Sequence, residues 1–166
     1  MFIQLQSQTF IPCYNYPMIR IITIGKRHTP ELAALIQDYE KRLRPPFTLT
    51  WTLLPNSPNT NPTSDESKQI LTKITPSDFV ILLDETGKNL SSPELSQLLT
   101  AQINNSKQIT LIIGGAYGVS PEIKQRANFI WSLSNLVFPH QIVRLILTEQ
   151  IYRAQTITQN HPYHHT

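Results

Sequence analysis

Three segments near the end of the chain carry the residue types best suited to binding and chemistry. Segment 109–118 is an apolar run that leads into Gly114-Gly-Ala-Tyr-Gly118, and segment 131–140 is an apolar run that ends on a polar loop with a proline and a histidine. Segment 159–165 gathers histidines, a tyrosine and a proline. Glycine has no Cβ, so the first segment lets the backbone approach a flat ligand closely. Together the segments predict a cofactor pocket built from loops at strand ends and a C-terminal tail whose residues take part in the reaction.

Both loop segments also allow a purely structural explanation. Gly114–Gly118 fits neither the dinucleotide fingerprint nor the phosphate-binding P-loop, and a plain turn between a strand and a helix would use the same residues. Leu133–Phe138 mixes apolar side chains with backbone amides, which suits the faces and the edge of an adenine ring. A hydrophobic strand entering a loop would have the same pattern, so these motifs alone leave both interpretations open.

The polar residues that follow have alternatives of the same kind. Glu149 and Arg153 are four positions apart on a predicted helix, where they form either a surface pair worth about 0.3 kcal/mol or a site in which Arg153 lies over a phosphate or a base. His140 is either a general base or a hydrogen-bonding residue of its loop. Tyr163 and His164 suit an unstacked RNA base, and the alternative is a disordered tail. The tail histidines lack an acidic or cysteine partner, which disfavours a metal site.

The elements that position these residues alternate along the chain. Apolar runs predict strands, and capped amphipathic segments predict helices. The predicted strands are 18–25, 47–54, 78–83, 108–113 and 129–133, and the predicted helices are 29–44, 65–74, one from 91, one from 120, and 141–158. This order predicts an α/β fold with a mostly parallel sheet flanked by helices on both faces. Ligands in such sheets bind at the carboxyl ends of the strands, which here are 83–87, 114–118 and 133–140.

Length and composition fit one globular domain. The chain has 166 residues, and its 14 Lys and Arg against 11 Asp and Glu permit a nucleic-acid partner without requiring one. A single cysteine, Cys13, excludes an internal disulfide and fits a reducing cytoplasm. No apolar stretch approaches a membrane-spanning length. Residues 1–17 carry no charge and lack the features of a signal peptide, so we interpret them as a disordered extension or a mis-called start before a single domain, 18–166.

Several of these motifs, taken together, resemble a known family. The match lies in Ile112–Val119, Phe138–Gln141, Arg144, Glu149–Ala154 and Asn160–His164. Segments 21–26 and 39–43 match the start of the same family, so the similarity extends from Met18 to about His165. The family is RlmH, the bacterial methyltransferases of the large ribosomal subunit RNA that belong to the SPOUT class.

The resemblance implies a fold, a cofactor and an assembly. The fold is α/β with a deep C-terminal trefoil knot, a rare exception to ordinary chain topology. The cofactor is S-adenosylmethionine bound in the knot, and the assembly is a homodimer in which the tail of one subunit helps to complete the active site of the other. Matched position by position, the cofactor contacts are Leu83, Gly114, Leu133, Ser134, Asn135, Leu136, Val137 and Phe138.

The resemblance also implies a reaction, methylation of N3 of a pseudouridine in the helix 69 loop of 23S rRNA on the assembled 70S ribosome. We expect His140, Tyr163 or His164 to assist the loss of the N3 proton. We expect Arg153, with Arg144, to hold a phosphate or carbonyl of the nucleotide. The alternatives are a knotted methyltransferase for a tRNA base or a ribose, and a non-catalytic ribosome-binding factor. The final helix, apolar nearly all round, predicts two partners: its own sheet and a second copy of the chain.

Overall fold

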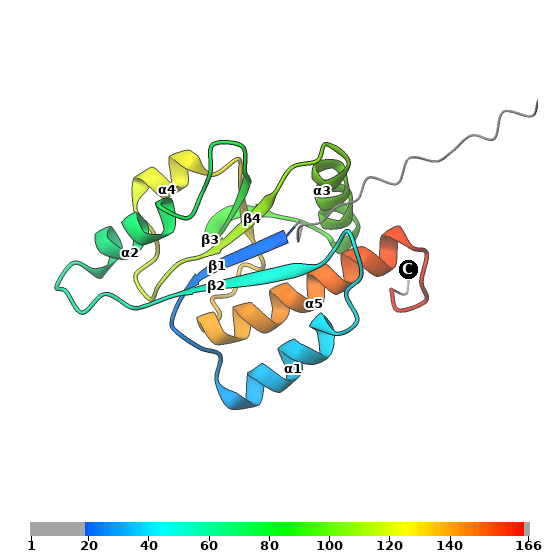
Figure 1. Cartoon of the computed structure of the whole chain (residues 1–166), viewed down its shortest axis with the longest axis horizontal. Coiled ribbons are helices and arrows are strands. Elements are labelled where there is room, and N and C mark those ends of the chain that lie inside the picture. The colour runs from blue at the N-terminus through cyan, green and yellow to red at the C-terminus, as the bar shows by residue number, and fades with distance from the viewer. Residues whose placement is uncertain (1–18, 165–166) are drawn as a thin grey trace, which may run out of the picture.

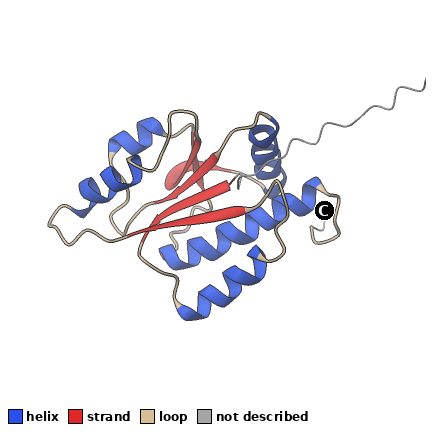
Figure 2. Cartoon of the chain, in the orientation of Figure 1, coloured by secondary structure: helices blue, strands red, loops and turns tan. Residues whose placement is uncertain are grey.

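The computed structural model describes residues 19–164 of the chain. Within that range strands and helices alternate, as the sequence predicts (Figure 1, Figure 2). The elements are β1 (Ile19–Ile24), α1 (Pro30–Glu40), β2 (Leu49–Leu54), α2 (Pro62–Leu71), β3 (Phe79–Asn89), α3 (Ser92–Asn104), β4 (Ile109–Ile113), α4 (Pro121–Arg126), β5 (Phe129–Ser132) and α5 (His140–Thr158). The predicted extension, residues 1–17, lies outside the described residues.

The five strands form one parallel sheet in the order β2-β1-β4-β3-β5. Strands that are covered on both faces are unbroken apolar runs, and every residue of β4 is buried. The predicted α/β class with a parallel sheet is therefore confirmed. The trefoil knot stays a prediction.

Successive strand residues point to opposite faces of the sheet and so supply two cores. Ile21 of β1 and Leu111 of β4 are paired in register and belong to the larger core. Their neighbours Ile22 and Ile112 belong to the smaller core on the other face. Figure 1 shows α1, α3 and α5 over the first face and α2 and α4 over the second. Both faces are closed, so the open strand ends are the place where a ligand could enter.

Three elements differ from the prediction by three residues or more at one end: α2, which spans Pro62–Leu71 where the sequence predicts 65–74, β3 and α1. β3 continues to Asn89, and its register shifts so that both Leu83 and Lys88 lie opposite Trp131 of β5. The polar segment 84–87 is therefore an insertion within a paired strand and not a free loop after it. α1 ends at Glu40, earlier than the predicted residue 44.

The early end of α1 follows from a contact with the last helix. Gln155 of α5 is buried, and its Oε1 accepts a hydrogen bond of 2.7 Å from the backbone N–H of Arg44. Its Nε2 donates to the carbonyl of Arg42 over 3.2 Å. One side chain therefore satisfies two backbone groups of the segment that follows α1, and Pro45 and Pro46, which have no N–H, close the helix beyond it.

α5 is covered mainly by elements of its own chain. It packs on β4 and between α1 and α3 (Figure 1), and Leu147, Ile151 and Ala154 are fully buried there. Much of the apolar surface that predicted a second copy is therefore already covered. Ile142, near the start of the helix, remains 37% exposed. The homodimer is not decided by this packing and stays a prediction.

Candidate functional site

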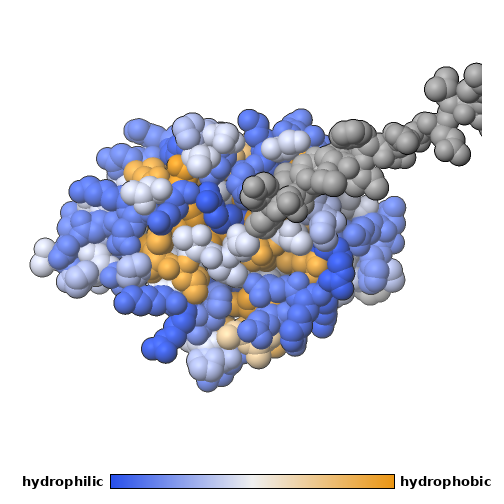
Figure 3. Space-filling model, in the orientation of Figure 1, coloured by the Kyte–Doolittle hydropathy of each residue, from blue (hydrophilic) through white to orange (hydrophobic). Residues whose placement is uncertain are grey.

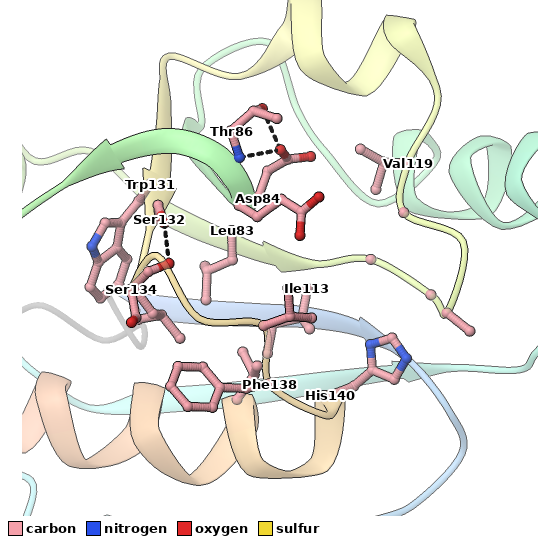
Figure 4. A pocket seen from close by; sticks show the side chains of 18 of the residues that line it. Leu83, Asp84, Thr86, Ile113, Val119, Trp131, Ser132, Ser134, Phe138 and His140 are labelled. Atoms are coloured by element: carbon pink, nitrogen blue, oxygen red, sulfur yellow. Dashed lines mark hydrogen bonds between the residues drawn. The ribbon is translucent and has the colours of Figure 1, made fainter.

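A cavity of about 450 Å³ lies at the carboxyl ends of β3, β4 and β5, within the size range of small-molecule sites. Its apolar walls are Leu83, Ile113, Trp131 and Phe138, and Figure 4 shows their side chains around a common hollow. His140, in the first turn of α5, closes another side (Figure 4). The loops that follow β4 and β5 complete the lining. The cavity therefore lies at the edge of the sheet where the sequence predicts a ligand.

The glycine loop after β4 is a tight turn at one wall of the cavity. The N–H of Gly118 donates to the carbonyl of Gly115 over 3.0 Å, and Gly118 has φ +76°. A Cβ on Gly114 would lie 2.8 Å from Cγ1 of Val119, closer than two non-bonded carbon atoms normally approach. Tyr117, at the tip of the turn, is 77% exposed. The glycines at 114 and 118 are thus required by the local geometry.

The inserted segment of β3 places a carboxylate in the cavity wall. Oδ1 of Asp84 accepts a hydrogen bond from the N–H of Thr86 over 2.9 Å (Figure 4). Oδ2 forms an ion pair with Nζ of Lys124 over 2.9 Å. Burial acts to raise the pKa of Asp84, but the hydrogen bonds from Thr86 and Lys124 outweigh it and leave the pKa below its ordinary value. Asp84 is therefore ionised at neutral pH. The sequence suggested only a polar strand end here.

The loop after β5 supplies most of the residues that the family resemblance assigns to the cofactor. The hydroxyl of Ser132 donates to the carbonyl of Ser134 over 2.8 Å (Figure 4), and the hydroxyl of Ser134 accepts from the N–H of Leu136 over 3.0 Å. Of the eight predicted contacts, seven line the cavity: Leu83, Gly114, Leu133, Ser134, Leu136, Val137 and Phe138. The eighth, Asn135, is exposed and is not part of the lining.

The C-terminal tail folds back on α5 and forms a second cluster. Oε1 of Glu149 accepts from Nη2 and Nε of Arg153, over 2.6 and 3.0 Å, and from Oη of Tyr163 over 3.1 Å. The guanidinium carbon of Arg153 lies 4.9 Å from the centre of the Tyr163 ring. That ring meets Tyr152 edge to face, with 4.9 Å between centroids. Up to His164, the tail is thus tied to the helix rather than frayed.

The surroundings of this cluster set the charge of its members. Burial, followed by a hydrogen bond with Tyr39 and the charge of Glu149, raises the pKa of Tyr163 far above its ordinary value. The hydrogen bond to Glu149 raises the pKa of Arg153. Tyr163 is therefore a neutral phenol that donates a hydrogen bond, and Arg153 is a permanent cation. Nη1 of Arg153 lies 3.5 Å from Nδ1 of His164, so that imidazole is close to the cluster.

The cavity and the tail cluster lie at opposite ends of α5. His140 is the first residue of the helix and Arg153 follows 13 positions later, which corresponds to about 20 Å at 1.5 Å per residue. The structure places His140 at the cavity and brings Arg153, Tyr163 and His164 together elsewhere. Within one chain these predicted residues do not form a single site.

Arg144 has partners that the sequence does not predict. Its side chain is 1% exposed and is not part of the cavity lining. Nη2 donates to the carbonyls of Ile24 and Gly25 over 2.6 and 3.2 Å, and Nη1 donates to that of Arg27 over 2.9 Å. Burial lowers the pKa of Arg144. The predicted role was to hold a nucleotide, but in the structure this guanidinium holds a loop of its own chain.

Comparison with known proteins gives a consistent result. A family model described as "Predicted SPOUT methyltransferase" matches residues 18–164. The ribosomal RNA large subunit methyltransferase H of Christiangramia forsetii is 42% identical over 154 residues, covering 89% of this chain and 98% of the relative. The protein of the same name from Dictyoglomus thermophilum is 42% identical over 151 residues, covering 89% and 99%.

Solved structures agree at the level of the fold. The crystal structure of a probable methyltransferase from Bordetella pertussis Tohama I has a TM-score of 0.56, with 10% identity, 83% of this chain covered and 96% of that chain. At that identity, the likeness concerns the arrangement of strands and helices alone.

Proposed function

The chain belongs to the SPOUT methyltransferase family and, within it, to the family of ribosomal RNA large subunit methyltransferase H, and from this membership we propose that it methylates 23S rRNA with S-adenosylmethionine as cofactor. The proposed target is N3 of a pseudouridine in the helix 69 loop of the assembled ribosome. The observation that carries the proposal is the cavity at the strand ends, because it is lined by seven of the eight residues that the family resemblance assigns to the cofactor.

The residues of the cavity fit this cofactor in size and chemistry. Leu83, Trp131 and Phe138 offer apolar surfaces to the faces of an adenine, and the backbone of 133–138 offers polar groups to its edge. Asp84 and Lys124 form an ion pair in the wall of the same cavity. When bound, S-adenosylmethionine supplies an electrophilic methyl group. The main task of the protein is then to align the target nitrogen with that methyl, and such positioning can contribute about 7–11 kcal/mol in favourable cases.

We place the complete active site between two copies of the chain. The tail cluster lies about 20 Å from His140 along its own helix, too far to act at the cavity of the same chain. In a homodimer with antiparallel α5 helices, the tail of one protomer would approach the cavity of its partner. This arrangement gives both predicted groups of residues a role in one site.

We propose roles toward the nucleotide for the charged and polar groups of the tail and for His140. The target N3–H must lose its proton, and an imidazole nitrogen of His140 or of His164 is the proposed acceptor. Tyr163 keeps its own proton, because its pKa is raised, and it serves as a hydrogen-bond donor to the base. Arg153 holds a carbonyl or phosphate oxygen through Nη1, while Glu149 orients the rest of the guanidinium. Arg144 supports the architecture and is not proposed to touch the substrate.

The proposed site of action is the bacterial cytoplasm, where the ribosome is. Within residues 19–164, no helix combines the length and apolar character needed to cross a bilayer.

Methyl transfer from radiolabelled S-adenosylmethionine tests the proposal. The substrates are intact 70S ribosomes and free 50S subunits that lack this modification, and the label is mapped to a nucleotide. We expect label on a helix 69 pseudouridine, and more of it with 70S ribosomes. Cofactor binding without label on either substrate would overturn the rRNA target and favour a tRNA. Failure to bind the cofactor would favour a non-catalytic ribosome-binding factor.

A further inference from the structure

The loop between β1 and α1 presents two exposed cations at the same edge of the sheet as the cavity. Lys26 and Arg27 are both exposed. Of the ion pairs formed within residues 19–164, none includes either of them. Figure 3 shows strongly hydrophilic side chains over this part of the surface. These two charges are therefore free to meet an external anion.

The backbone of this loop is held in place by the first turns of α5. Arg144 donates to the carbonyls of Gly25 and Arg27 in the loop and to that of Ile24, the last residue of β1. Gln141 adds two bonds, because its Oε1 accepts from the N–H of Thr29 over 3.2 Å and its Nε2 donates to the carbonyl of Arg27 over 3.3 Å. The two cations are thus presented by a fixed backbone.

Gly25 is required for this arrangement. It has φ +108°, a conformation that favours glycine, and a Cβ at this position would lie 2.7 Å from Nη2 of Arg144. The guanidinium therefore reaches the loop carbonyls only because residue 25 has no side chain. The close fit shows that the attachment of the loop to α5 is built into the fold.

Arg144 also contributes charge beneath the loop. It is buried, and the groups that accept its hydrogen bonds are backbone carbonyls and a ring nitrogen of His28, with no carboxylate among its partners within the described residues. Buried charges are screened less by salt than exposed ones. In this part of the chain Glu31 is the nearest acid in sequence, and it is exposed on α1. Three cations, Lys26, Arg27 and Arg144, are thus gathered at this end of β1.

The same helical turn connects the loop with the cavity. His140 and Val143 line the cavity, whereas Gln141 and Arg144 contact the loop. Figure 1 shows the β1–α1 connection beside the start of α5. The cations therefore lie next to the cavity wall.

We propose that Lys26 and Arg27 form a phosphate-contact surface that aligns the RNA backbone beside the cavity. The ligand is the phosphodiester backbone of the substrate RNA, read without base specificity, since phosphate contacts set position and register while base contacts supply specificity. The inference rests on the proposed function, because an enzyme that acts on one nucleotide within a ribosome must fix the backbone around it.

The test compares two double variants that remove the same charge. K26A/R27A removes the proposed contact. K73A/K107A is the matched control, because Lys73 and Lys107 are exposed, form no ion pair within residues 19–164 and precede β3 and β4 at the opposite edge of the sheet. For each protein we would measure the Kd for S-adenosylmethionine, the KM and kcat for undermethylated 70S ribosomes, and the salt dependence of ribosome binding.

K26A/R27A is expected to raise the KM for ribosomes about tenfold. The logarithm of its association constant for ribosomes should fall less steeply with the logarithm of salt concentration, with a slope smaller in magnitude by roughly 1.5, as the loss of two phosphate contacts predicts. Its Kd for the cofactor and the values of the control variant should match the wild type. Equal KM values and slopes in all three proteins would overturn the inference and leave the proposed function standing. Cofactor binding without methyl transfer by the wild type would overturn both.

Discussion

The two ends of α5 present different chemistry. At its start, loops from three strand ends surround a cavity with apolar walls, and hydrogen bonds to backbone groups hold the surrounding segments. At its end, one carboxylate organises a guanidinium and a phenol above a cluster of aromatic rings. The first end forms a cavity, and the second presents fixed charge and hydrogen-bond donors. The two proposed roles, holding the cofactor and orienting the nucleotide, therefore belong to different residues, and each should be lost separately by mutation.

The largest expected effect is at the end of the helix. Arg153→Ala should lower kcat for methyl transfer by about 10²–10³-fold, the usual loss when a group that stabilises developing charge is removed, and should leave the Kd for S-adenosylmethionine unchanged. Steady-state kinetics on 70S ribosomes and calorimetric titration of the cofactor measure the two quantities. Arg153→Lys keeps the charge but loses the planar fork, so it should recover only part of the rate. Weaker cofactor binding in Arg153→Ala would contradict the separation of roles.

A change in the cavity near the start of the helix should weaken cofactor binding and leave the tail cluster unaffected. Gly114→Ala places a Cβ 2.8 Å from Cγ1 of Val119, and overpacking of this kind costs about 1–3 kcal/mol. We expect the Kd for the cofactor to rise by about tenfold or more, with the tail cluster intact. Titration calorimetry measures the affinity. Ala101→Ser, at an exposed position of α3 outside the cavity lining, is the control and should bind normally.

The smallest effect concerns stability at alkaline pH and belongs to the tail cluster alone. The pKa of Tyr163 is raised above its ordinary value of 10.0 by burial and by its neighbours Tyr39 and Glu149. As the pH rises past the ordinary value of 10.0, Tyr163 of the unfolded chain releases its proton before Tyr163 of the folded chain does. The free energy of unfolding therefore falls, by less than about 1 kcal/mol over the first pH unit for a partly exposed group. Tyr163→Phe should lack this contribution. Urea unfolding at neutral and alkaline pH measures it, and identical pH profiles for the two proteins would contradict the role assigned to burial.

The fold and the cavity could be predicted because both depend on local pattern. The runs that became β1, β3 and β4 are predominantly apolar, and such runs alternating with helices permit few arrangements other than a covered parallel sheet. Since the carboxyl ends of parallel strands share one edge, the segments after β3, β4 and β5 had to meet. That is why Leu83, Gly114 and Phe138 were expected together and are found in one lining.

The rest depended on contacts between distant segments. The inserted residues 84–87 are fixed by the pairing of β3 with β5, which nothing in segment 78–89 itself reveals. Arg144 resembled a substrate-binding cation, because its type is the same whether it meets a phosphate or the carbonyls of residues 24–27. The sequence of the tail is compatible with both disorder and function, and only contacts with distant Glu149 and Tyr152 hold Tyr163 in place.

The length of α5 determines the distance and the relative orientation of the residues at its two ends. The helix is unbroken from His140 to Thr158, and each added residue would lengthen it by about 1.5 Å and rotate everything beyond by about 100°. A single insertion near its middle would therefore turn Glu149 and Arg153 away from the direction that His140 defines. The helix cannot change its length without changing the orientation of its two ends relative to each other.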